Sequence, residues 1–395
     1  MKPVLRSIVK VLARFIVPRR NEEISPAKVK RILICGQMGI GNMILFTPFL
    51  KALRGYFKNS QIVMFVLKSN GADKVLAGSQ LVDEIIVWNI DGMSYLQKVK
   101  AVVTMVRFKP DLIINRFHSY NAYNVLINIL SRAPYRVGHV SSGGWKGNHD
   151  YLNNYPVVMS DGEHDIDRYL RLAEKIGISG IDRKTVFDID HHDDTVAKEF
   201  LEMNRVGRGT KFIAVHMGTS LIQRWKQWEI EKWAILTECL LEQGIPVVAL
   251  GSEDEREMIV DAFSGASSKP IFAVGELTLK QAGAVIRKSR LLVCNDSSLM
   301  HIAVAVGTPV VAVYGPNDHK RSAPLGAQHT IIRKDLPCSP CDNFDGAEKV
   351  KICPINRRCF ESMSPQEVLA VVMKKYDETS HEHEQQEERK GVSIG

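Results

Sequence analysis

The residues best suited to chemistry form one short stretch in the second half of the chain. An apolar run at residues 291–294 ends in four polar residues, 295–298. A small-residue amphipathic segment at 299–306 and a second apolar run at 309–314 follow. This pattern predicts a strand, a tight turn, a helix and another strand. Polar residues in such a turn lie at the carboxyl edge of a parallel sheet, where sheets of this kind bind ligands.

The start of this predicted helix suits a phosphate group. The first N–H groups of a helix have no partner within it and lie at the positive end of its dipole. His301 follows Ser298 by three residues and would share its face of the helix. The structural alternative is that Asp296 or Ser297 caps the helix and that His301 is hydrogen-bonded inside a packed layer.

A second candidate is the glycine-rich loop at residues 36–42 (GQMGIGN), which follows a predicted strand at 31–35. Its glycines lack the spacing of a dinucleotide-binding fingerprint, and no acid stands at the end of the next predicted strand. Glycines let the backbone approach a bound molecule closely. We therefore expect this loop to line a binding cleft.

Strand patterns alternate with helix patterns in two regions of the chain, which predicts an α/β fold with two doubly wound parallel sheets. Further strands are predicted at 61–67, 84–88, 111–115, 212–218, 246–251 and 271–274. Helices are predicted at 72–77, 95–107, 120–130, 163–176, 229–242, 253–263, 278–288 and 364–376. Another helix reaches Tyr56, and one alternative start has Thr47 as its cap with Pro48 in first position. Residues 140–161 are predicted to be loop.

Several motifs resemble those of the heptosyltransferase-like glycosyltransferases, the lipopolysaccharide core heptosyltransferase family of the ADP-heptose type. The stretch from Asp296 reads D-S-S-x-x-H-x-A-x-A-x-G-T-P, similar to the family's D-[ST]-G-x-x-H-x-A-x-A-x-G-x-P, with Ser298 in the place of Gly. GIGNMILFTPFLKALR resembles the family's first motif, with Asn42 where Asp is usual. HMGT at 216–219, RWKQW at 224–228 and GELTL at 275–279 resemble three further elements. The resemblance extends over residues 30–373.

This resemblance implies a GT-B fold, with two Rossmann-like domains facing across a cleft. It also implies inverting transfer of a sugar, with heptose as the first candidate, from a nucleotide diphosphate-sugar to a lipopolysaccharide core or related surface glycan. The expected parts are a basic N-terminal segment (1–26), an acceptor-side domain (27–180), a linker (181–210), a donor-binding domain (211–376) and a disordered tail (377–395). Alternative functions are a catalytically idle nucleotide-sugar-binding protein and a sugar-nucleotide epimerase of the same architecture.

Residue roles are carried over from the family motifs. Negative charge on a departing nucleotide can be stabilised by helix-terminal amides and a cation, so neither a cofactor nor a catalytic metal is expected. An amide cannot serve as a base near neutral pH, so Asn42 would position the acceptor or cap the first helix. The expected catalytic residues are Asn42 and Lys226. The expected donor-binding residues are Thr219, Lys226, Asp296, Ser297, Ser298 and His301, and the acceptor-side loop contributes Gly39, Gly41 and Asn42.

Basic residues suggest two further contacts. Arg116, Arg132 and Arg136 are candidate contacts to an anionic acceptor, the alternative being plain surface charge. The first twenty residues hold six basic residues and no acid, and the cations interrupt the apolar residues at four-residue steps. This excludes a membrane span and favours a helix lying on an anionic membrane surface, or else one packed on the protein itself. We expect a cytoplasmic protein, peripheral on the inner face of the cytoplasmic membrane, that binds no nucleic acid.

Four of the seven cysteines lie close together in the sequence: Cys338, Cys341, Cys353 and Cys359. A cytosolic chain disfavours disulfides, which leaves a tetrahedral metal site or free thiols. The spacing does not decide between these two alternatives, so no metal is predicted.

Overall fold

The protein folds into two units, each built on its own parallel sheet. The structure, a computed structural model, describes residues 22–36, 38–66, 71–89, 92–116, 122–140, 152–160, 162–219, 221–341, 353 and 355–392. The chain divides into Met1–Val186 and Phe187–Gly395. This boundary falls inside residues 181–210, the range predicted to be a linker, and much of that range forms helix α7 (His191–Met203). The N-terminal segment predicted to lie on a membrane falls outside the described residues up to position 21.

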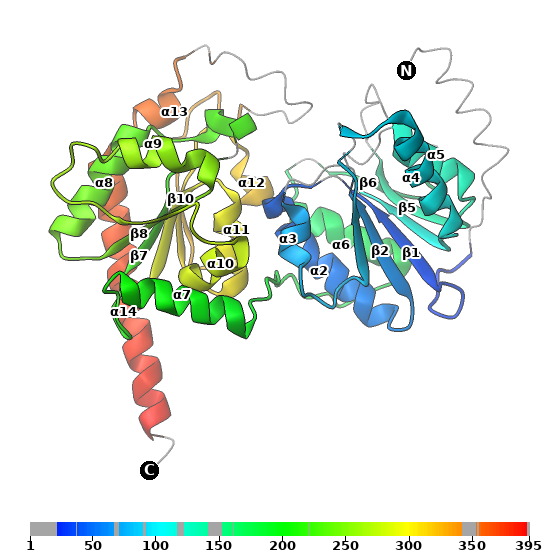
Figure 1. Cartoon of the computed structure of the whole chain (residues 1–395), viewed down its shortest axis with the longest axis horizontal. Helices are drawn as coiled ribbons and strands as arrows, with labels where there is room; N and C mark the ends of the chain where they lie inside the picture. Colours follow the sequence, from blue (N-terminus) through cyan, green and yellow to red (C-terminus); the bar gives the residue numbers. More distant parts are fainter. Residues whose placement is uncertain are drawn as a thin grey trace. The chain divides into compact units, whose positions relative to one another are not determined.

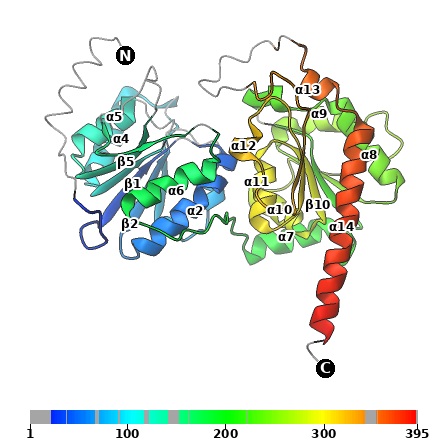
Figure 2. The same ribbon diagram turned by 180° about the vertical axis from the view of Figure 1, so that it is seen from behind.

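The first unit has a six-stranded parallel sheet in the order β3-β2-β1-β4-β5-β6. Its strands are β1 (Arg31–Cys35), β2 (Gln61–Val66), β3 (Glu84–Val87), β4 (Leu112–Asn115), β5 (Tyr135–Val140) and β6 (Tyr155–Val158). Its helices are α2 (Ile40–Tyr56), α3 (Ala72–Leu76), α4 (Tyr95–Arg107), α5 (Ala122–Leu130) and α6 (Asp165–Ile176). Figures 1 and 2 show α4 with α5 on one face of the sheet and α2 with α6 on the other.

Successive side chains of a strand point to opposite faces of this sheet, and both faces are buried. Leu33, Val63 and Ile113 pack toward Met105 of α4 and Ile127 of α5. The residues between them on the strands are buried as well, including Ile32, Ile34, Met64 and Ile114. Sheets covered on both faces have such nearly continuous apolar strands, which explains why the strands were visible in the sequence.

Helix α2 runs unbroken through Pro48, so the predicted start at Thr47 was wrong. Proline has no N–H and cannot bond the carbonyl four residues earlier, that of Ile44. Thr47 Oγ1 donates to this Ile44 carbonyl at 2.7 Å and accepts the Val186 N–H at 2.8 Å. A side chain thus satisfies the carbonyl that proline leaves open, and the helix continues.

The prediction of loop over residues 140–161 was wrong at β6, and β5 was not predicted at all. Strand β6 is a short edge strand that contains Pro156, a residue that argues against a strand in sequence reading. In β5, Gly138 lies so close to the Asn153 amide that a Cβ there would collide with it.

The second unit repeats the architecture, with the strand order β12-β11-β10-β7-β8-β9, all parallel. The strands are β7 (Ile213–His216), β8 (Val247–Gly251), β9 (Ile271–Val274), β10 (Leu291–Asn295), β11 (Val310–Val313) and β12 (Thr330–Ile332). The helices after α7 are η3 (Leu221–Lys226), α8 (Ile230–Glu242), η4 (Glu253–Glu255), α9 (Arg256–Asp261), α10 (Leu279–Lys288), α11 (Ser298–Val306), α12 (His319–Ser322), α13 (Arg358–Glu361) and α14 (Pro365–Val392).

The last helix of the chain packs its first turns on the core and then continues well beyond them. Val368 and Val372 of α14 join the cluster built around Trp228 and Trp233. The helix extends to Val392, into the range 377–395 for which a disordered tail is predicted. This tail is rich in Glu and Gln, which are good helix formers. Within the described part of the chain, no helix is long and apolar enough to span a membrane.

Candidate functional site

Strand order in the second unit reverses between β7 and β10. Strands β8 and β9 extend to one side of β7, and β11 and β12 extend to the other side of β10. Open parallel sheets bind ligands at this point, outside the carboxyl ends of the two strands. His216 ends β7 and Asn295 ends β10.

The Asn295 side chain, at the end of β10, hydrogen-bonds the backbone of the segment that follows β7. Its Nδ2 donates to the Met217 carbonyl at 2.7 Å, and its Oδ1 accepts the Trp228 N–H at 3.0 Å. The side chain is fully buried. It therefore holds the segment containing Lys226 beside the end of β10, a role that sequence reading did not assign.

Lys226 and Asp296 form a largely buried ion pair at this edge. Lys226 Nζ lies 3.4 Å from Asp296 Oδ2 and 5.4 Å from the centroid of the Trp225 ring. Asp296 Oδ2 also accepts a hydrogen bond from Asn317 Nδ2. The carboxylate, held by two partners, fixes the ammonium at the end of the sheet.

Helix α11 begins without a side-chain cap. Ser297 is its N-cap residue, but its hydroxyl makes no capping bond to the helix. Instead Ser297 Oγ lies 2.9 Å from His216 Nδ1. Ser297 therefore does not realise the capping alternative, and a helix start without a side-chain cap is a favourable position for an anionic group.

His216 is held in turn by Glu255. His216 Nε2 lies 3.5 Å from Glu255 Oε2, which also accepts the Ser252 N–H at 2.8 Å and the Ser252 hydroxyl at 2.9 Å. A Cβ at Gly218 would collide with the Glu255 carboxylate. Glycine at this position therefore lets Glu255 reach His216.

The remaining donor-side candidates lie around this helix start or beside β7. His301 is buried in the early part of α11, and Ser298, half-buried, is the first residue of the helix. Thr219 Oγ1 donates to the Gln223 carbonyl at 3.3 Å.

In the first unit the strand order reverses between β1 and β4, and the glycine-rich loop follows β1. Gly39 is the N-cap of α2, and Gly41 and Asn42 lie in its first turn. The Asn42 side chain is exposed. Asn42 therefore does not cap this helix, and the predicted capping alternative was wrong.

Two of the three arginines proposed as acceptor contacts are buried, so the alternative of plain surface charge was wrong for them. Arg116, at the end of β4, donates from Nη2 to the Tyr169 hydroxyl at 3.2 Å. Arg136 donates from Nε to the Leu152 carbonyl at 2.5 Å and from Nη1 to the Ala133 carbonyl. Arg132 alone is exposed.

The profile of glycosyltransferase family 9 (heptosyltransferase) matches residues 128–351, more than half of the chain. The chain belongs to glycosyltransferase family 9. This family 9 glycosyltransferase is 25% identical to lipopolysaccharide heptosyltransferase 3 of Escherichia coli K12 over 293 residues, 71% of this chain and 80% of that protein. It is 28% identical to lipooligosaccharide heptosyltransferase 2 of Haemophilus influenzae over 316 residues, 76% of this chain and 88% of that protein.

Solved structures resemble this family 9 chain as well. A glycosyl transferase family 9 protein from Veillonella parvula has a TM-score of 0.71 at 22% identity and covers 90% of this chain and 99% of its own. The E. coli ADP-heptose lipopolysaccharide heptosyltransferase II has a TM-score of 0.68 at 19% identity, covering 89% and 99%. At these identities the likeness concerns the fold, and it confirms the predicted GT-B fold.

The structure gathers most of the donor-side candidates of the family 9 enzyme and adds three residues to them. Lys226, Asp296 and Ser297 all lie around the ends of β7 and β10. The residues that sequence reading missed are His216, Glu255 and Asn295. His216 lies in the quoted HMGT motif, but its contact with Ser297 joins positions 81 apart, which no local pattern reveals.

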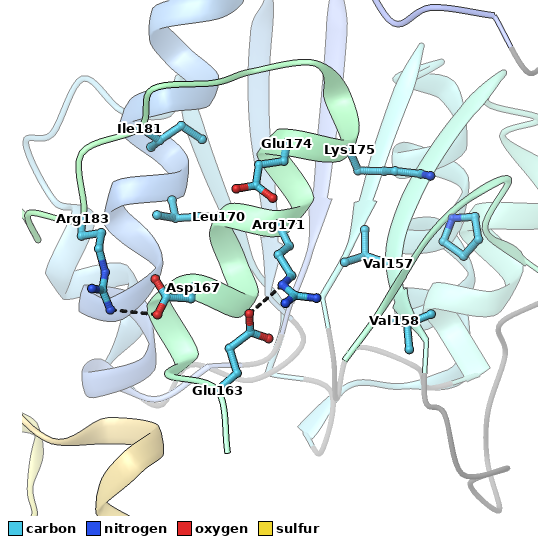
Figure 3. Close-up of a pocket in the computed structure, with 11 residues that line it drawn as sticks. Val157, Val158, Glu163, Asp167, Leu170, Arg171, Glu174, Lys175, Ile181 and Arg183 are labelled. Carbon is cyan, nitrogen blue, oxygen red and sulfur yellow. Dashed lines mark hydrogen bonds and ion pairs between the residues drawn. The ribbon is translucent and has the colours of Figure 1, made fainter. Parts of the chain in front are cut away.

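An open pocket of about 790 Å³ lies elsewhere in the family 9 chain, between β6, α6 and residues 181–183 of the first unit. Figure 3 shows two arginines of this pocket, each facing an acidic side chain. Arg171 pairs with Glu163 at 2.6 Å, and Arg183 pairs with Asp167 at 2.8 Å. None of the predicted site residues lines this pocket.

For the clustered cysteines, both a tetrahedral metal site and free thiols remain as alternatives. Cys338 and Cys341 are exposed, Cys353 is half-buried and Cys359 is buried. Burial, together with the neighbouring Cys341 and Cys353, raises the pKa of Cys359 to about 11. Among the described residues no group of three or more side chains is arranged to hold a metal, and residues 342–352 between the cysteines lie outside that part.

Acid should remove stability that Glu255 supplies. Burial acts to raise the pKa of Glu255, but the charge of His216 and hydrogen bonds from His216 and Ser252 outweigh it and lower the pKa from 4.5 to about 2. Between these values the unfolded chain binds more protons than the folded one, so stability falls as the pH falls. We expect wild type to lose about 3 kcal/mol more than Glu255→Gln over this window.

Denaturant unfolding at several pH values between 5 and about 2 measures this difference. Glu253→Gln, an exposed change in the same turn, serves as the control and should follow the wild-type curve. Equal losses in wild type and Glu255→Gln would show that the carboxylate carries no such linkage.

Proposed function

We propose that this chain transfers heptose from ADP-heptose, with inversion at the sugar, to a lipopolysaccharide core or related surface glycan. The observation that carries the proposal is the uncapped start of α11 beside the Lys226–Asp296 pair, at the reversal of strand order in the second unit. The E. coli relatives of known structure, named as ADP-heptose lipopolysaccharide heptosyltransferase II and as WaaC with ADP, support the donor assignment.

The chemistry needs a site for growing negative charge. When the bond between sugar and diphosphate breaks, the departing nucleoside diphosphate gains charge, which fixed donors and cations stabilise without reorganising. The N–H groups of α11 and the Lys226 ammonium can supply this stabilisation. Asp296 acts as a positioning residue, because it holds Lys226, while Thr219, Ser297, Ser298 and His301 are proposed contacts to the donor.

The first unit is proposed to receive the acceptor. Gly39, Gly41 and Asn42 would contact it through backbone and amide groups, since the two glycines carry no side chains. Arg116 and Arg136 are proposed to support this region from inside the unit and not to contact the acceptor from solvent, because both are buried and hydrogen-bonded. Arg132, which is exposed, remains a proposed contact to an anionic acceptor.

A cytoplasmic location on the inner face of the membrane is part of the same proposal. The basic and apolar residues among the first twenty would attract the chain to anionic lipids. Such an arrangement brings the enzyme to an acceptor that is anchored in lipid.

Donor binding is the first test. We expect ADP-heptose to raise the melting temperature of the protein more than UDP-, GDP- or dTDP-sugars at equal concentration, since ligands that bind only the folded state stabilise it. Lack of any shift with all four classes would refute the donor assignment.

Acceptor dependence separates the alternative functions. Release of ADP only when a core glycan is present supports the transferase. A melting shift without any release identifies a binding protein, and conversion of the donor sugar without acceptor identifies an epimerase.

A further inference from the structure

Large apolar side chains are exposed on one layer of the first unit. Of the ten such side chains that are exposed in the described part of the chain, six belong to α4 and α5. They are Tyr95, Leu96, Val99 and Val103 of α4, and Leu126 and Leu130 of α5. We call these six residues the α4–α5 face. Tyr95 and Leu96 are 80% and 79% exposed. Single exposed apolar side chains are common on protein surfaces, whereas a cluster of them marks an interaction site.

The apolar residues of α4 form one stripe on its outward side. Tyr95, Val99 and Val103 recur every four residues, so they lie above one another on the helix. Ala101, Val102 and Met105 of the same helix are buried, and Val102 and Met105 belong to the core cluster on the sheet. Tyr95 is 80% exposed and Val99 and Val103 are 42% and 40% exposed, so the outer part of the stripe is left to solvent.

Helix α5 carries the layer further with no charged residue of its own. Its sequence is AYNVLINIL, and Leu126 and Leu130 are exposed at four-residue spacing. The two helices lie against each other on the same face of the sheet (Figures 1 and 2). A helix that is apolar on both its inner and outer sides is normally covered on both.

Basic residues border the α4–α5 face. Lys100 and Arg107 are exposed and follow Leu96 and Val103 by four residues each. Lys109 and Arg132, beyond the ends of the two helices, are exposed as well. Neither helix contains an acid. The next acid after α4, Asp111, accepts the backbone N–H groups of Lys30 and Arg31 at 2.9 Å.

We propose that the α4–α5 face docks on an anionic lipid bilayer. An apolar stripe with cations beside it is the pattern of a helix that lies in a membrane interface, and Tyr95 suits the boundary between water and lipid. The chain's own first twenty residues are a poor occupant, because their six cations would repel Lys100 and Arg107. This inference rests on the proposed function in one respect, that the acceptor is anchored in the same membrane.

Vesicle binding by the full chain tests the proposal. Two variants remove the two features separately: Leu96→Ser with Val99→Ser and Leu126→Ser, and Lys100→Gln with Arg107→Gln. Matched controls change exposed residues of other helices: Met203→Gln with Ile235→Ser for the apolar set, and Lys51→Gln with Lys198→Gln for the basic set.

The partition coefficient onto vesicles of phosphatidylglycerol and phosphatidylcholine is the measured quantity. We expect each test variant to lower it roughly tenfold or more, since each Lys or Arg near an anionic surface contributes about a fivefold factor, and each control to leave it unchanged. Vesicles of phosphatidylcholine alone should show no effect of the lysine and arginine changes. An unchanged melting temperature in each variant confirms that the fold is intact.

Wild-type partition by both test variants would overturn the proposal. A second overturning result is a wild type that self-associates in solution, with the apolar variant monomeric and its vesicle binding intact, because the face would then bind another copy. The vesicles carry no donor or acceptor, so vesicle binding is measured separately from sugar transfer. A failure of the proposed transferase function would therefore leave the result for the α4–α5 face unchanged.

Discussion

Replacing Lys226 with methionine is expected to lower the kcat of sugar transfer about 100- to 1000-fold, the range found when one fixed donor is removed from a site of growing negative charge. Lys226 Nζ is held 3.4 Å from Asp296 Oδ2 beside the uncapped start of α11, so it is placed before any ligand arrives. Because the ammonium would meet charge that develops in the transition state, the loss should appear in kcat and leave the acceptor KM unchanged.

Two further variants separate the role of the cation from a defect in folding. Lys226→Met leaves Asp296 without its cation, and an unpaired buried carboxylate is itself destabilising. The double variant Lys226→Met with Asp296→Asn removes both charges and should melt near the wild-type temperature while transfer stays low. Steady-state kinetics of all three proteins with the same donor and acceptor provides the measurement.

Lys232→Met is the matched control. Lys232 also lies near a tryptophan, 6.0 Å from the Trp228 ring centroid, but its Nζ donates to the Phe360 and Glu361 carbonyls at 3.0 and 2.9 Å. We expect it to lower stability and to leave kcat largely intact. A full kcat in Lys226→Met, or an equal loss in both lysine variants, would remove Lys226 from the proposed mechanism.

Strands that form a short apolar run between polar turns could be read from the sequence, both inside a sheet and at its edge. Strand β1 lies at the predicted residues 31–35, and β9 at 271–274. The edge strand β6 was missed, since an edge strand with Pro156 has neither the length nor the composition of a central one. The buried strand β5 was missed as well, because Arg136, Gly138 and His139 interrupt its apolar residues. An unbroken apolar run, rather than burial, produced the readable signal.

The position of polar residues at a strand end was also readable, whereas contacts across the sheet were not. Asp296 and Ser297 could be assigned because they end one strand and open one helix. The contacts of Ser297 with His216 and of His216 with Glu255 depend on β7, β8 and β10 lying side by side. Sequence position gives no measure of this proximity before the strand order is known.

The burial of charged side chains was the property that the sequence predicted least well. Arg116 and Arg136 looked like surface charge, yet both are buried inside the first unit, where Tyr169 and two backbone carbonyls accept hydrogen bonds from them. A single sequence shows that an arginine is present but not whether its five donors will find partners. The long helix α14 was underestimated for a different reason, because its charged composition is shared by helices and disordered tails.

Asn42 leads to the second large expected effect. Aspartate at this position is usual in the family motif that the sequence resembles, and a carboxylate there can take the proton of the acceptor hydroxyl. Proton transfer of this kind is typically worth about 100- to 10,000-fold. The amide of Asn42 cannot perform it, but it is exposed in the first turn of α2 and can hydrogen-bond an acceptor.

We expect Asn42→Asp to raise kcat about 100-fold and Asn42→Ala to lower kcat/KM about tenfold or less, the effect of one lost hydrogen bond. The new aspartate would be ionised at neutral pH, because the start of α2 carries no other acid and favours negative charge. Gln97→Glu is the matched control, since it makes the same change at the third position of α4 and should leave transfer unchanged.

The central claim is that this chain is an active transferase with an amide at position 42. Release of ADP from ADP-heptose by wild type, measured with and without a water-soluble core glycan and beside Asn42→Asp, tests it most directly. We predict release by wild type that requires the glycan and that Asn42→Asp accelerates. No detectable release by wild type, together with clear release by Asn42→Asp, would contradict the claim and show that this site has lost its base.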